Sequence, residues 1–285
     1  MQQNTPDWLA FRRTGIGSSD VAAIMGKCPF RTRYQVYLSK VEGAVQEDNF
    51  AMARGREWEP VLRAKAEEKY NCRFEPRVAK VTLDGVLFIA SLDGDNGDML
   101  LEGKVPGKEN IALAESGKLP EHYMLQVQQQ LLVSGRPKAL YACFDFEKKK
   151  NIYVEVLPDY EIQSELQSEC VKFWREHIEP KLPPELAEGD YIECSEDVYA
   201  VEAGVYKLAK QNFDMAEAAL ESAKDALKER LGKLPGLRGH GLKLCRYSRK
   251  GNVQTSRIPE LIGVDLEKYR AKPVSVFKIT EEKDG

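Results

Sequence analysis

The chain of 285 residues contains no apolar run that approaches the roughly 20 residues of a membrane span. Its six cysteines are scattered, and the absence of a Cys-x-x-Cys pair argues against a zinc site, an iron–sulfur cluster and a disulfide framework. Residues 1–7 are polar and lack a signal-peptide core. Together these absences predict a protein of a reducing cytoplasm that has no membrane partner.

Positive charge is not in excess either, because 42 Lys and Arg residues stand against 45 Asp and Glu residues, for a net charge of -3. This balance does not by itself indicate a nucleic-acid partner, although acidic sites and acidic outer surfaces can mask a local basic channel. The 42% hydrophobic and 31% charged residues are typical of a globular protein. The length suits one large domain, or a domain with an appendage.

The densest polar cluster lies in residues 91–104, where two short apolar runs each lead into charged residues across a Gly-rich turn. This pattern predicts a β-hairpin. Glu102 and Lys104 then share one face of the second strand, and Asp93 ends the first strand nearby. Two carboxylates this close need a cation, and hard oxygen ligands suit Mg²⁺ or Mn²⁺. Lys104 would hold a water molecule or stabilise charge that develops on a phosphate.

Two other interpretations apply to the same stretch. A calcium-binding loop needs Asp or Asn at its fifth position and Glu at its twelfth. Gly97 and Lys104 occupy these positions, which argues against such a loop. A plain solvated hairpin also fits, because an Asp followed by Glu-x-Lys is a weak pattern on its own. The other motifs of the chain therefore decide between these interpretations.

The N-terminal region predicts a candidate anion site. Residues 7–13 predict a short helix with Asp7 as a possible N-cap, and a Gly/Ser turn then opens a second helix over residues 19–25. Free backbone N–H groups at a helix N-terminus attract anions, and Arg12 and the Ser19 hydroxyl lie beside them. The alternatives are an ordinary N-cap and a phosphate pocket.

Two longer helices carry further polar candidates. In the helix expected over residues 49–70, Glu59 lies near the buried stripe and needs either an arginine or a metal to offset its burial. The helix expected over residues 121–134 places Tyr123, Gln126 and Gln130 on one face, beside apolar residues. That face is either solvated or half-buried against a site.

The remaining pattern predicts a mixed α/β (α+β) fold with a central sheet flanked by helices. Strands are expected over residues 77–83, 87–93, 98–104, 139–144 and 152–156, and a further helix over residues 159–179. Prolines and a glycine within residues 183–189 indicate a boundary, so we expect one domain over residues 1–190 and an extension over residues 191–285. That extension should contain a long helix over residues 196–231 and a small hairpin that turns near residues 250–252.

Five segments in a fixed order form a more specific pattern. They are Trp8-Leu9-Ala10-Phe11-Arg12 with Ile16-Gly17-Ser18-Ser19-Asp20-Val21, Gly55-Arg56-Glu57-Trp58-Glu59, Ser91-Leu92-Asp93-Gly94, Leu101-Glu102-Gly103-Lys104-Val105-Pro106, and Tyr123-Met124-Leu125-Gln126-Val127-Gln128. Together they resemble the motifs of the phage lambda exonuclease and YqaJ-like viral recombinase nucleases. This family belongs to the PD-(D/E)XK superfamily, so the resemblance implies a restriction-endonuclease-like core.

The resemblance also implies a metal site. Asp93 and Glu102 would ligate Mg²⁺, with the Val105 carbonyl as a further oxygen ligand. A two-metal site is expected, in which Glu59 holds the second ion directly or through water, and Mn²⁺ is a possible substitute.

Further site residues follow from the same resemblance. Lys104 would orient or deprotonate the attacking water, and Gln126 would position Lys104. Arg12 and Ser19 would bind the terminal 5′-phosphate, and Tyr123 would also contact DNA.

The implied function is a Mg²⁺-dependent 5′→3′ exonuclease. It would digest one strand of linear double-stranded DNA to leave 3′ overhangs for phage or prophage recombination in a bacterial host. A ring-shaped homotrimer and a phage single-strand annealing protein as partner are further expectations. The alternatives are another nuclease of the superfamily, such as a RecB- or Cas4-like enzyme, and a non-cleaving DNA-binding recombination protein.

The chain departs from the family pattern at three positions. Leu92 replaces the usual proline before the aspartate, and Gly103 replaces a larger apolar residue, which weakens the strand locally. Gln130 stands where related nucleases often carry tyrosine, and the sequence leaves its role open. Residues beyond about 189 lie outside the lambda exonuclease pattern.

Overall fold

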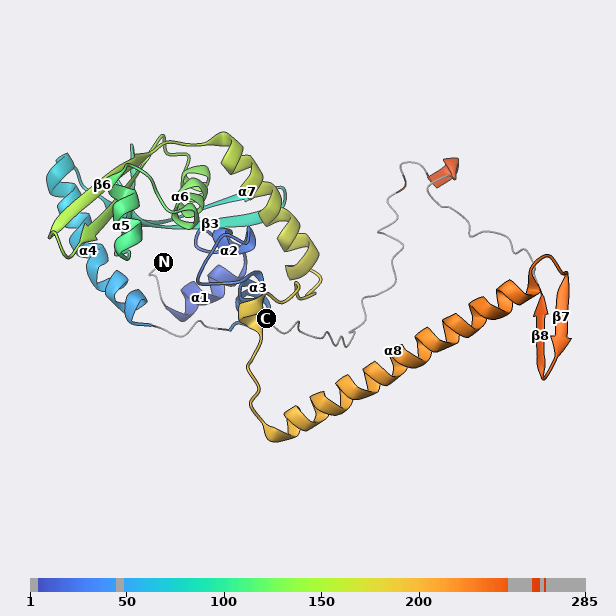
Figure 1. Cartoon of the computed structure of the whole chain (residues 1–285). Coiled ribbons are helices and arrows are strands. Elements are labelled where there is room, and N and C mark those ends of the chain that lie inside the picture. The colour runs from blue at the N-terminus through green and yellow to red at the C-terminus, as the bar shows by residue number, and fades with distance from the viewer. Residues whose placement is uncertain (1–4, 45–48, 246–257, 262–263, 265–285) are drawn as a thin grey trace. The chain divides into compact units, whose positions relative to one another are not determined.

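Within residues 5–44, 49–245, 258–261 and 264, which this computed structural model describes, a six-stranded mixed sheet lies at the centre of the N-terminal part (Figure 1). The strands are β1 (Ile16–Gly17), β2 (Glu75–Leu83), β3 (Val86–Asp95), β4 (Leu100–Lys104), β5 (Ala139–Asp145) and β6 (Lys150–Val156). The strand order is β1-β3-β4-β5-β6, and β2 pairs with β3. The β1–β3 and β4–β5 pairs are parallel, whereas β2–β3, β3–β4 and β5–β6 are antiparallel.

Helices cover the sheet. They are α1 (Pro6–Arg13), α2 (Val21–Ile24), α3 (Arg33–Val41), α4 (Phe50–Tyr70), α5 (Lys108–Glu115), α6 (Glu121–Ser134) and α7 (Tyr160–Phe173), which continues into a π-helical turn over Trp174–Ile178. This arrangement confirms the predicted α/β class with a mixed central sheet. The sequence pattern did not predict α3, α5 or the two-residue strand β1.

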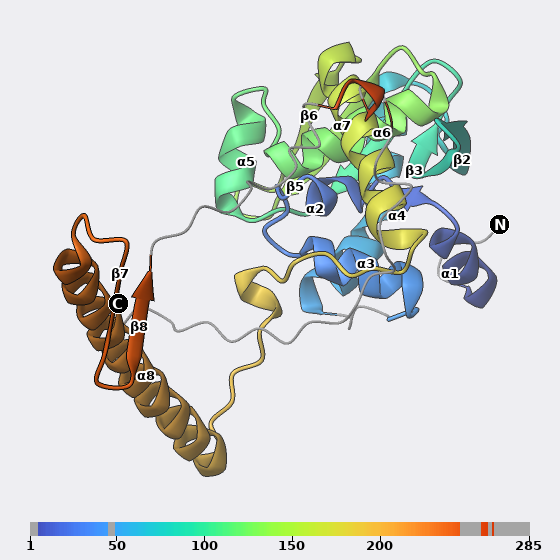
Figure 2. The ribbon, with the colours of Figure 1, turned by 90° about the vertical axis from the view of Figure 1, so that its right-hand side faces the viewer.

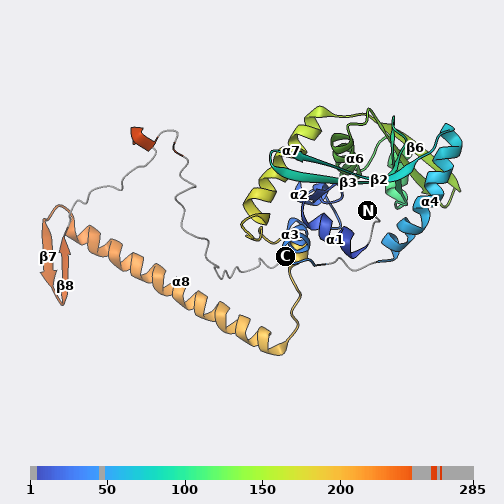
Figure 3. The same cartoon turned by 180° about the vertical axis from the view of Figure 1, so that it is seen from behind.

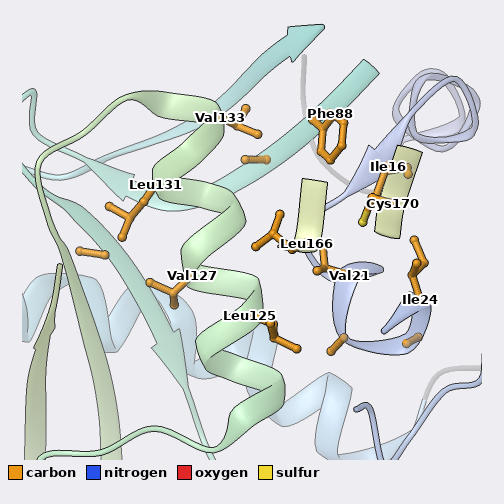
Figure 4. Packing of buried hydrophobic residues seen from close by; sticks show 14 of the residues in the cluster. Ile16, Val21, Ile24, Phe88, Leu125, Val127, Leu131, Val133, Leu166 and Cys170 are labelled. Carbon is orange, nitrogen blue, oxygen red and sulfur yellow. The ribbon is translucent and has the colours of Figure 1, made fainter. Parts of the chain in front are cut away.

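Two hydrophobic clusters form the core. In the larger cluster, helices α2, α6 and α7 pack together beside β1 and β3 (Figure 4). Its labelled residues are Ile16, Val21, Ile24, Phe88, Leu125, Val127, Leu131, Val133, Leu166 and Cys170. The smaller cluster includes Ala66 of α4, and Leu101 and Leu140 of the sheet. Neighbouring residues Leu100 and Leu101 belong to different clusters, so β4 is buried on both faces.

Two expectations for the N-terminal helices are corrected by the structure. Thr5 caps α1, because its side chain accepts a hydrogen bond from the Trp8 N–H, whereas Asp7 lies in the first turn. The helix expected over residues 19–25 is only the four-residue α2, because the chain before Val21 forms a turn.

The strand that ends at the candidate site is irregular. Between Leu92 and Asp95, β3 has one residue more than the facing part of β2, which forms a β-bulge at Asp93 and Gly94. A Cβ on Gly94 would lie 2.6 Å from the Phe74 Cβ, so a larger residue does not fit there. Bulges re-aim side chains, and this one lies at the predicted ligand Asp93.

The chain divides into two compact units, Met1–Tyr191 and Ile192–Gly285. In the second unit, α8 (Asp197–Leu231) is a single long helix, and β7 (Gly236–Gly239) pairs with β8 (Leu242–Cys245) (Figures 2 and 3). This hairpin turns at His240 and Gly241, which both have positive φ angles. The turn expected near residues 250–252 lies outside the described residues. None of the described helices is long and apolar enough to cross a membrane.

Candidate functional site

The structure brings together the three charged residues predicted from the hairpin. The Asp93 Oδ2 atom at the bulge of β3 accepts a hydrogen bond of 2.9 Å from the Gly103 N–H of β4. Glu102, on the same strand, is only 1% exposed, and the Lys104 Nζ atom forms an ion pair with Glu102 Oε1. A Cβ on Gly103 would lie 3.2 Å from the Leu62 Cδ1 atom, so a larger residue in this central strand would require the Leu62 side chain to shift.

Two glutamines of α6 hold the buried Glu102 carboxylate. The Gln126 amide donates to Glu102 Oε1 at 2.6 Å, and the Gln130 amide donates to Glu102 Oε2 at 2.6 Å. Gln130 is fully buried and also donates to the Ser91 carbonyl at 3.1 Å. Gln126 and Lys104 therefore both contact Glu102 Oε1, and Gln130 donates to Glu102 Oε2. Gln130 follows Gln126 by four residues and so lies on the same helix face, which is the sequence feature that indicates a second donor to Glu102.

Arg63 joins the site from α4, although the sequence analysis did not select it. Its guanidinium donates to the Asp93 carbonyl at 2.7 Å and lies 3.5 Å from Glu59 Oε1. Burial raises the pKa of Glu59, Arg63 opposes that rise, and the nearby Glu102 adds to it. Of the two partners considered for Glu59, the structure shows the arginine. Its position one helical turn after Glu59 is the sequence feature that indicates the contact.

The electrostatics of this site favour neutralisation of its carboxylates. Burial and then the charge of Glu102 raise the pKa of Asp93 well above its usual range. Burial by itself would lower the pKa of Lys104, but Glu102 and Asp93 outweigh burial and raise it. One lysine thus faces two converging carboxylates, with Glu59 close enough to act on both.

The donor set fits a divalent cation by its chemistry. Among the residues that the structure describes, no three His, Cys, Asp or Glu side chains converge as a ready metal-binding group. The repulsion between Asp93 and Glu102 is nevertheless the interaction that a bound cation would relieve, and their oxygens are hard ligands. Val105 follows directly on β4, so its carbonyl is close to Glu102 and Lys104 in the chain.

A second buried cluster surrounds Asp20, whose side chain is 1% exposed. Asp20 accepts from the Gly17 N–H at 2.9 Å and pairs with Arg31 at 2.6 Å and with Lys40 at 2.7 Å. Arg12 lies 3.6 Å from the same carboxylate. Burial by itself would raise the pKa of Asp20, but Lys40, Arg31 and Arg12 outweigh burial and hold that pKa well below its usual range. Three cations therefore share one carboxylate.

The predicted anion-site residues Arg12 and Ser19 lie at the exposed side of this cluster. An Arg12 guanidinium nitrogen donates to the Ser19 Oγ atom at 2.7 Å. The sequence pattern predicts the pairing of these two residues but not the role of Asp20 as their anchor. Asp20 stands directly after Ser19 in the quoted motif, and a charged residue beside a Gly/Ser turn is the feature that could have indicated it.

Tyr123 lies with the carboxylate site. The Lys104 Nζ atom is 5.5 Å from the centroid of the Tyr123 ring, which is a cation–π distance. The ring also lies 4.1 Å from His122 and 5.9 Å from Tyr141, measured between centroids. Tyr123 is therefore a neighbour of Lys104, at the end of α6 that begins beside the site.

Comparison with known proteins adds independent findings. Residues 7–137 match the model of the YqaJ-like viral recombinase domain, which confirms the resemblance drawn from the five motifs. The uncharacterized protein YqaJ of Bacillus subtilis (strain 168) is 26% identical over 186 residues, which cover 62% of this chain and 57% of that protein. The chain thus spans little more than half the length of this curated relative.

A solved structure is also similar. The alkaline exonuclease LHK-Exo of Laribacter hongkongensis is 28% identical, with a TM-score of 0.54 over 62% of this chain and 94% of that chain. The structure of LHK-Exo in complex with dAMP has 28% identity, a TM-score of 0.52 and the same coverage. Both buried clusters lie within residues 7–137, which match the family model.

Proposed function

We propose that the chain is a metal-dependent nuclease that acts on DNA ends. The observation that carries this proposal is the convergence of Asp93, Glu102 and Lys104 at one end of β3 and β4, with Glu102 held by two buried amides. The 28% identity to a structure described as an alkaline exonuclease supports the same class of reaction. More specifically, we propose 5′→3′ digestion of one strand of linear double-stranded DNA.

Asp93 and Glu102, with the Val105 carbonyl, would hold a Mg²⁺ ion, and Glu59 would contribute to a second ion, for which Mn²⁺ is a possible substitute. A divalent cation bound there would supply Lewis acidity toward the phosphate and lower the pKa of bound water. Gln126 and Gln130 keep both Glu102 oxygens in place, so the carboxylate is oriented before substrate arrives. Gln130 thus takes a positioning role at the position where related nucleases often carry tyrosine.

Lys104 acts as a charged donor in this proposal. Its Nζ atom forms an ion pair with Glu102 Oε1, and a lysine held in this way is an ammonium with no lone pair to accept a proton. An ammonium at this position donates hydrogen bonds to the attacking water or to a phosphate oxygen that gains charge. We therefore favour orientation of water and charge stabilisation by Lys104 over deprotonation.

Arg12 and Ser19 would bind the 5′-phosphate and so set the direction of digestion. The three cations around Asp20 exceed its single charge by two, and a terminal phosphate carries about -1.5 to -2 charges at pH 7. The Asp20 carboxylate also fixes the cations in place, so the pocket is organised without the ligand. Tyr123, beside Lys104, would contact the DNA near the cleaved bond.

The wider biological setting follows from the family resemblance. We propose a role in phage or prophage recombination in the cytoplasm of a bacterial host, with 3′ overhangs as product. A homotrimeric ring and a single-strand annealing protein as partner belong to the same proposal. We further propose that residues 1–190 form the nuclease domain and residues 191–285 an extension to it.

One experiment tests the central proposal. Linear duplexes with 5′-phosphate or 5′-hydroxyl ends, labelled on either strand, are incubated with the protein in Mg²⁺, Ca²⁺ or EDTA. We expect 5′→3′ release of nucleotides in Mg²⁺ only, and faster digestion of the phosphorylated ends. Digestion from 3′ ends or within circular DNA would instead favour a RecB- or Cas4-like activity. Binding without cleavage in every metal would favour a DNA-binding recombination protein.

A further inference from the structure

Five lysines from two distant parts of the chain line one hollow of about 740 Å³. Lys65 and Lys69 come from α4, Lys148 and Lys149 from the turn between β5 and β6, and Lys150 from the start of β6. The other lining residues are Glu68, Asn151 and Tyr153. These eight residues form the lysine hollow.

The acidic residues near the lysine hollow do not balance it. Glu115 is shared, at 2.7 Å from Lys148 and 3.8 Å from Lys150, and Asp145 lies 3.9 Å from Lys148. Lys65 has only a 3.9 Å contact with the exposed Glu68. In the part of the chain that the structure describes, neither Lys69 nor Lys149 lies within 4.0 Å of a carboxylate. A chain with a net charge of -3 thus concentrates positive charge at this place.

The local structure indicates that the lysines of the turn do not stabilise the fold. Lys149 has a φ angle of 48°, a left-handed conformation that favours glycine or asparagine. Its neighbours Lys148 and Lys150 carry the same charge, so the three side chains repel one another. Asp145 already stabilises the turn by accepting from the Glu147 and Lys148 N–H groups at 2.9 and 3.2 Å. Residues that oppose local stability in this way are expected at binding sites.

Lys69 shows how the hollow keeps a charged group available. Its Nζ atom lies 4.2 Å from the centroid of the Tyr153 ring and 5.4 Å from that of the Tyr70 ring. The aromatic faces orient the ammonium without neutralising it, because a ring has no net charge. An anion that enters the hollow therefore meets a positioned cation.

The lysine hollow lies close to the proposed catalytic residues along α4. Lys65 and Lys69 follow Glu59 by six and ten residues, which corresponds to roughly 9 and 15 Å along the helix axis. Beside Glu59 on α4, the Trp58 ring stacks on Phe144 of β5 with a centroid distance of 4.7 Å, which joins this helix to the strand that precedes the turn. One base pair of duplex rises roughly 3.4 Å, so these axial separations from Glu59 correspond to about three to four base pairs.

We propose that the lysine hollow binds backbone phosphates of duplex DNA a few base pairs from the cleaved bond. This inference rests on the proposed function, since it takes the same DNA as ligand. Phosphodiester oxygens match the hollow because each carries one delocalised negative charge and because lysines contact them without reading the base sequence. The hollow would then hold the duplex while the end is processed at Asp93, Glu102 and Lys104.

The test compares two double variants of the full chain. K69Q/K149Q removes the two cations that have no carboxylate partner. The control K172Q/K181Q removes two exposed lysines of the same unit. Among the described residues, these two lysines also have no carboxylate partner. Binding to a long linear duplex with 5′-hydroxyl ends is measured in Ca²⁺ by fluorescence anisotropy over a range of salt concentrations, and circular dichroism checks the fold.

K69Q/K149Q should reduce the slope of log Kd against log salt by about 1.8, because each lost phosphate contact removes about 0.9. Its affinity should fall roughly tenfold at low salt, and the control should change little. An unchanged slope in K69Q/K149Q, or an equal reduction of the slope in both variants, would overturn the proposal that the lysine hollow binds DNA. Cleavage of DNA by the parent protein would still support the proposed function. A parent protein that neither binds nor cleaves DNA overturns both proposals.

Discussion

The two buried charge clusters of the first unit are opposite in composition. Around Asp20, one carboxylate is shared by three cations, which lower its pKa. Around Glu102, two carboxylates converge on one lysine, and the pKa of Asp93 is raised. Each cluster therefore leaves charge of one sign uncompensated. This difference is the basis of the two proposed ligands, an anion at the first cluster and a cation at the second.

The two clusters also differ in what they do for the fold. The Asp20 carboxylate joins the loop before α2 to Arg31 and to Lys40 of α3, so its contacts connect separate segments. The Asp93 carboxylate accepts from Gly103 but also repels Glu102, so its negative charge opposes folding. A neutral isostere should therefore have opposite effects at the two positions, and this contrast gives the first prediction.

D20N should lower the free energy of unfolding by about 3–5 kcal/mol, because it removes one partner from a buried ionic cluster. The pKa of Asp20 is lowered in the folded state, so its contribution to stability is full at pH 7. That contribution is lost only as pH falls below about 4 and through the folded-state pKa. Urea unfolding of D20N and the parent protein should show a large gap at pH 7 that narrows in acid. A gap that stays constant with pH would mean that the Asp20 charge contributes nothing.

D93N is the matched comparison. In EDTA it should unfold at a higher temperature than the parent protein, with a gain on the order of 1 kcal/mol, because the repulsion with Glu102 is relieved. It should also lose the stabilisation that Ca²⁺ or Mg²⁺ gives to the parent, since a ligand oxygen is gone. Equal metal affinity in both proteins by calorimetry would remove Asp93 from the metal site. A loss of stability as large as that of D20N would remove the contrast between the clusters.

K104A should lower the rate of cleavage about 10²-fold or more, because it removes a donor that faces charge developing on the phosphate. DNA binding in Ca²⁺ should remain, since the lysine is not a metal ligand. Single-turnover hydrolysis and anisotropy measure the two effects separately. K108A serves as the control, because Lys108 is an exposed lysine that pairs with Glu147. Turnover by K104A at the parent rate would contradict the site assignment.

R12A should lose most of the preference for phosphorylated ends. One charged hydrogen-bond partner contributes roughly 1.5–3 kcal/mol, so we expect about a 10- to 150-fold slower reaction on 5′-phosphate ends. The hydroxyl-ended substrate should lose much less, because the carboxylate cluster is untouched. Competition between the two ends in one reaction measures the ratio directly. Equal losses on both ends would show that Arg12 serves folding or general DNA affinity.

The sequence predicted the parts of these clusters that depend on local order. Alternation along one strand places Glu102 and Lys104 on one face, and the structure confirms the strands on either side of the turn. The mixed sheet and the helices α4 and α6 follow from hydrophobic periodicity in the same way. Arg12 and Ser19 are only seven residues apart, and they meet as expected.

Long-range contacts and backbone irregularities were not predictable in this way. The bulge that carries Asp93 depends on how β2 pairs with β3. The Asp20 partner Lys40 comes from α3, which the pattern did not reveal, and Arg31 lies just before that helix. Gln130 reaches Glu102 only because α6 packs over β3 and β4. The lysine hollow likewise joins residues about eighty positions apart. Periodicity along one segment carries no information about such pairings.

The smallest effect is expected from removing the tail. A chain that ends at Cys194 should fold and should still cleave short duplexes, because both charge clusters lie before residue 137. The end of the first unit is held by its own contacts: the Thr32 hydroxyl donates to Asp190 at 2.6 Å, and the Tyr37 hydroxyl donates to the Lys181 carbonyl at 3.0 Å. These bonds are retained in the shortened chain. In α8, Leu231 is the one buried residue among those described, so the helix adds little core to its own unit.

The truncated and full-length proteins should therefore have similar unfolding temperatures for the first unit and similar rates on short DNA. Circular dichroism and a nucleotide-release assay measure the two properties. Because the contrast between the clusters lies wholly within the first unit, D20N and D93N should keep their opposite effects in the shortened chain. An insoluble truncated protein, or one inactive on short duplexes, would show that residues 195–285 complete the nuclease core. The boundary proposed at residue 190 would then be wrong.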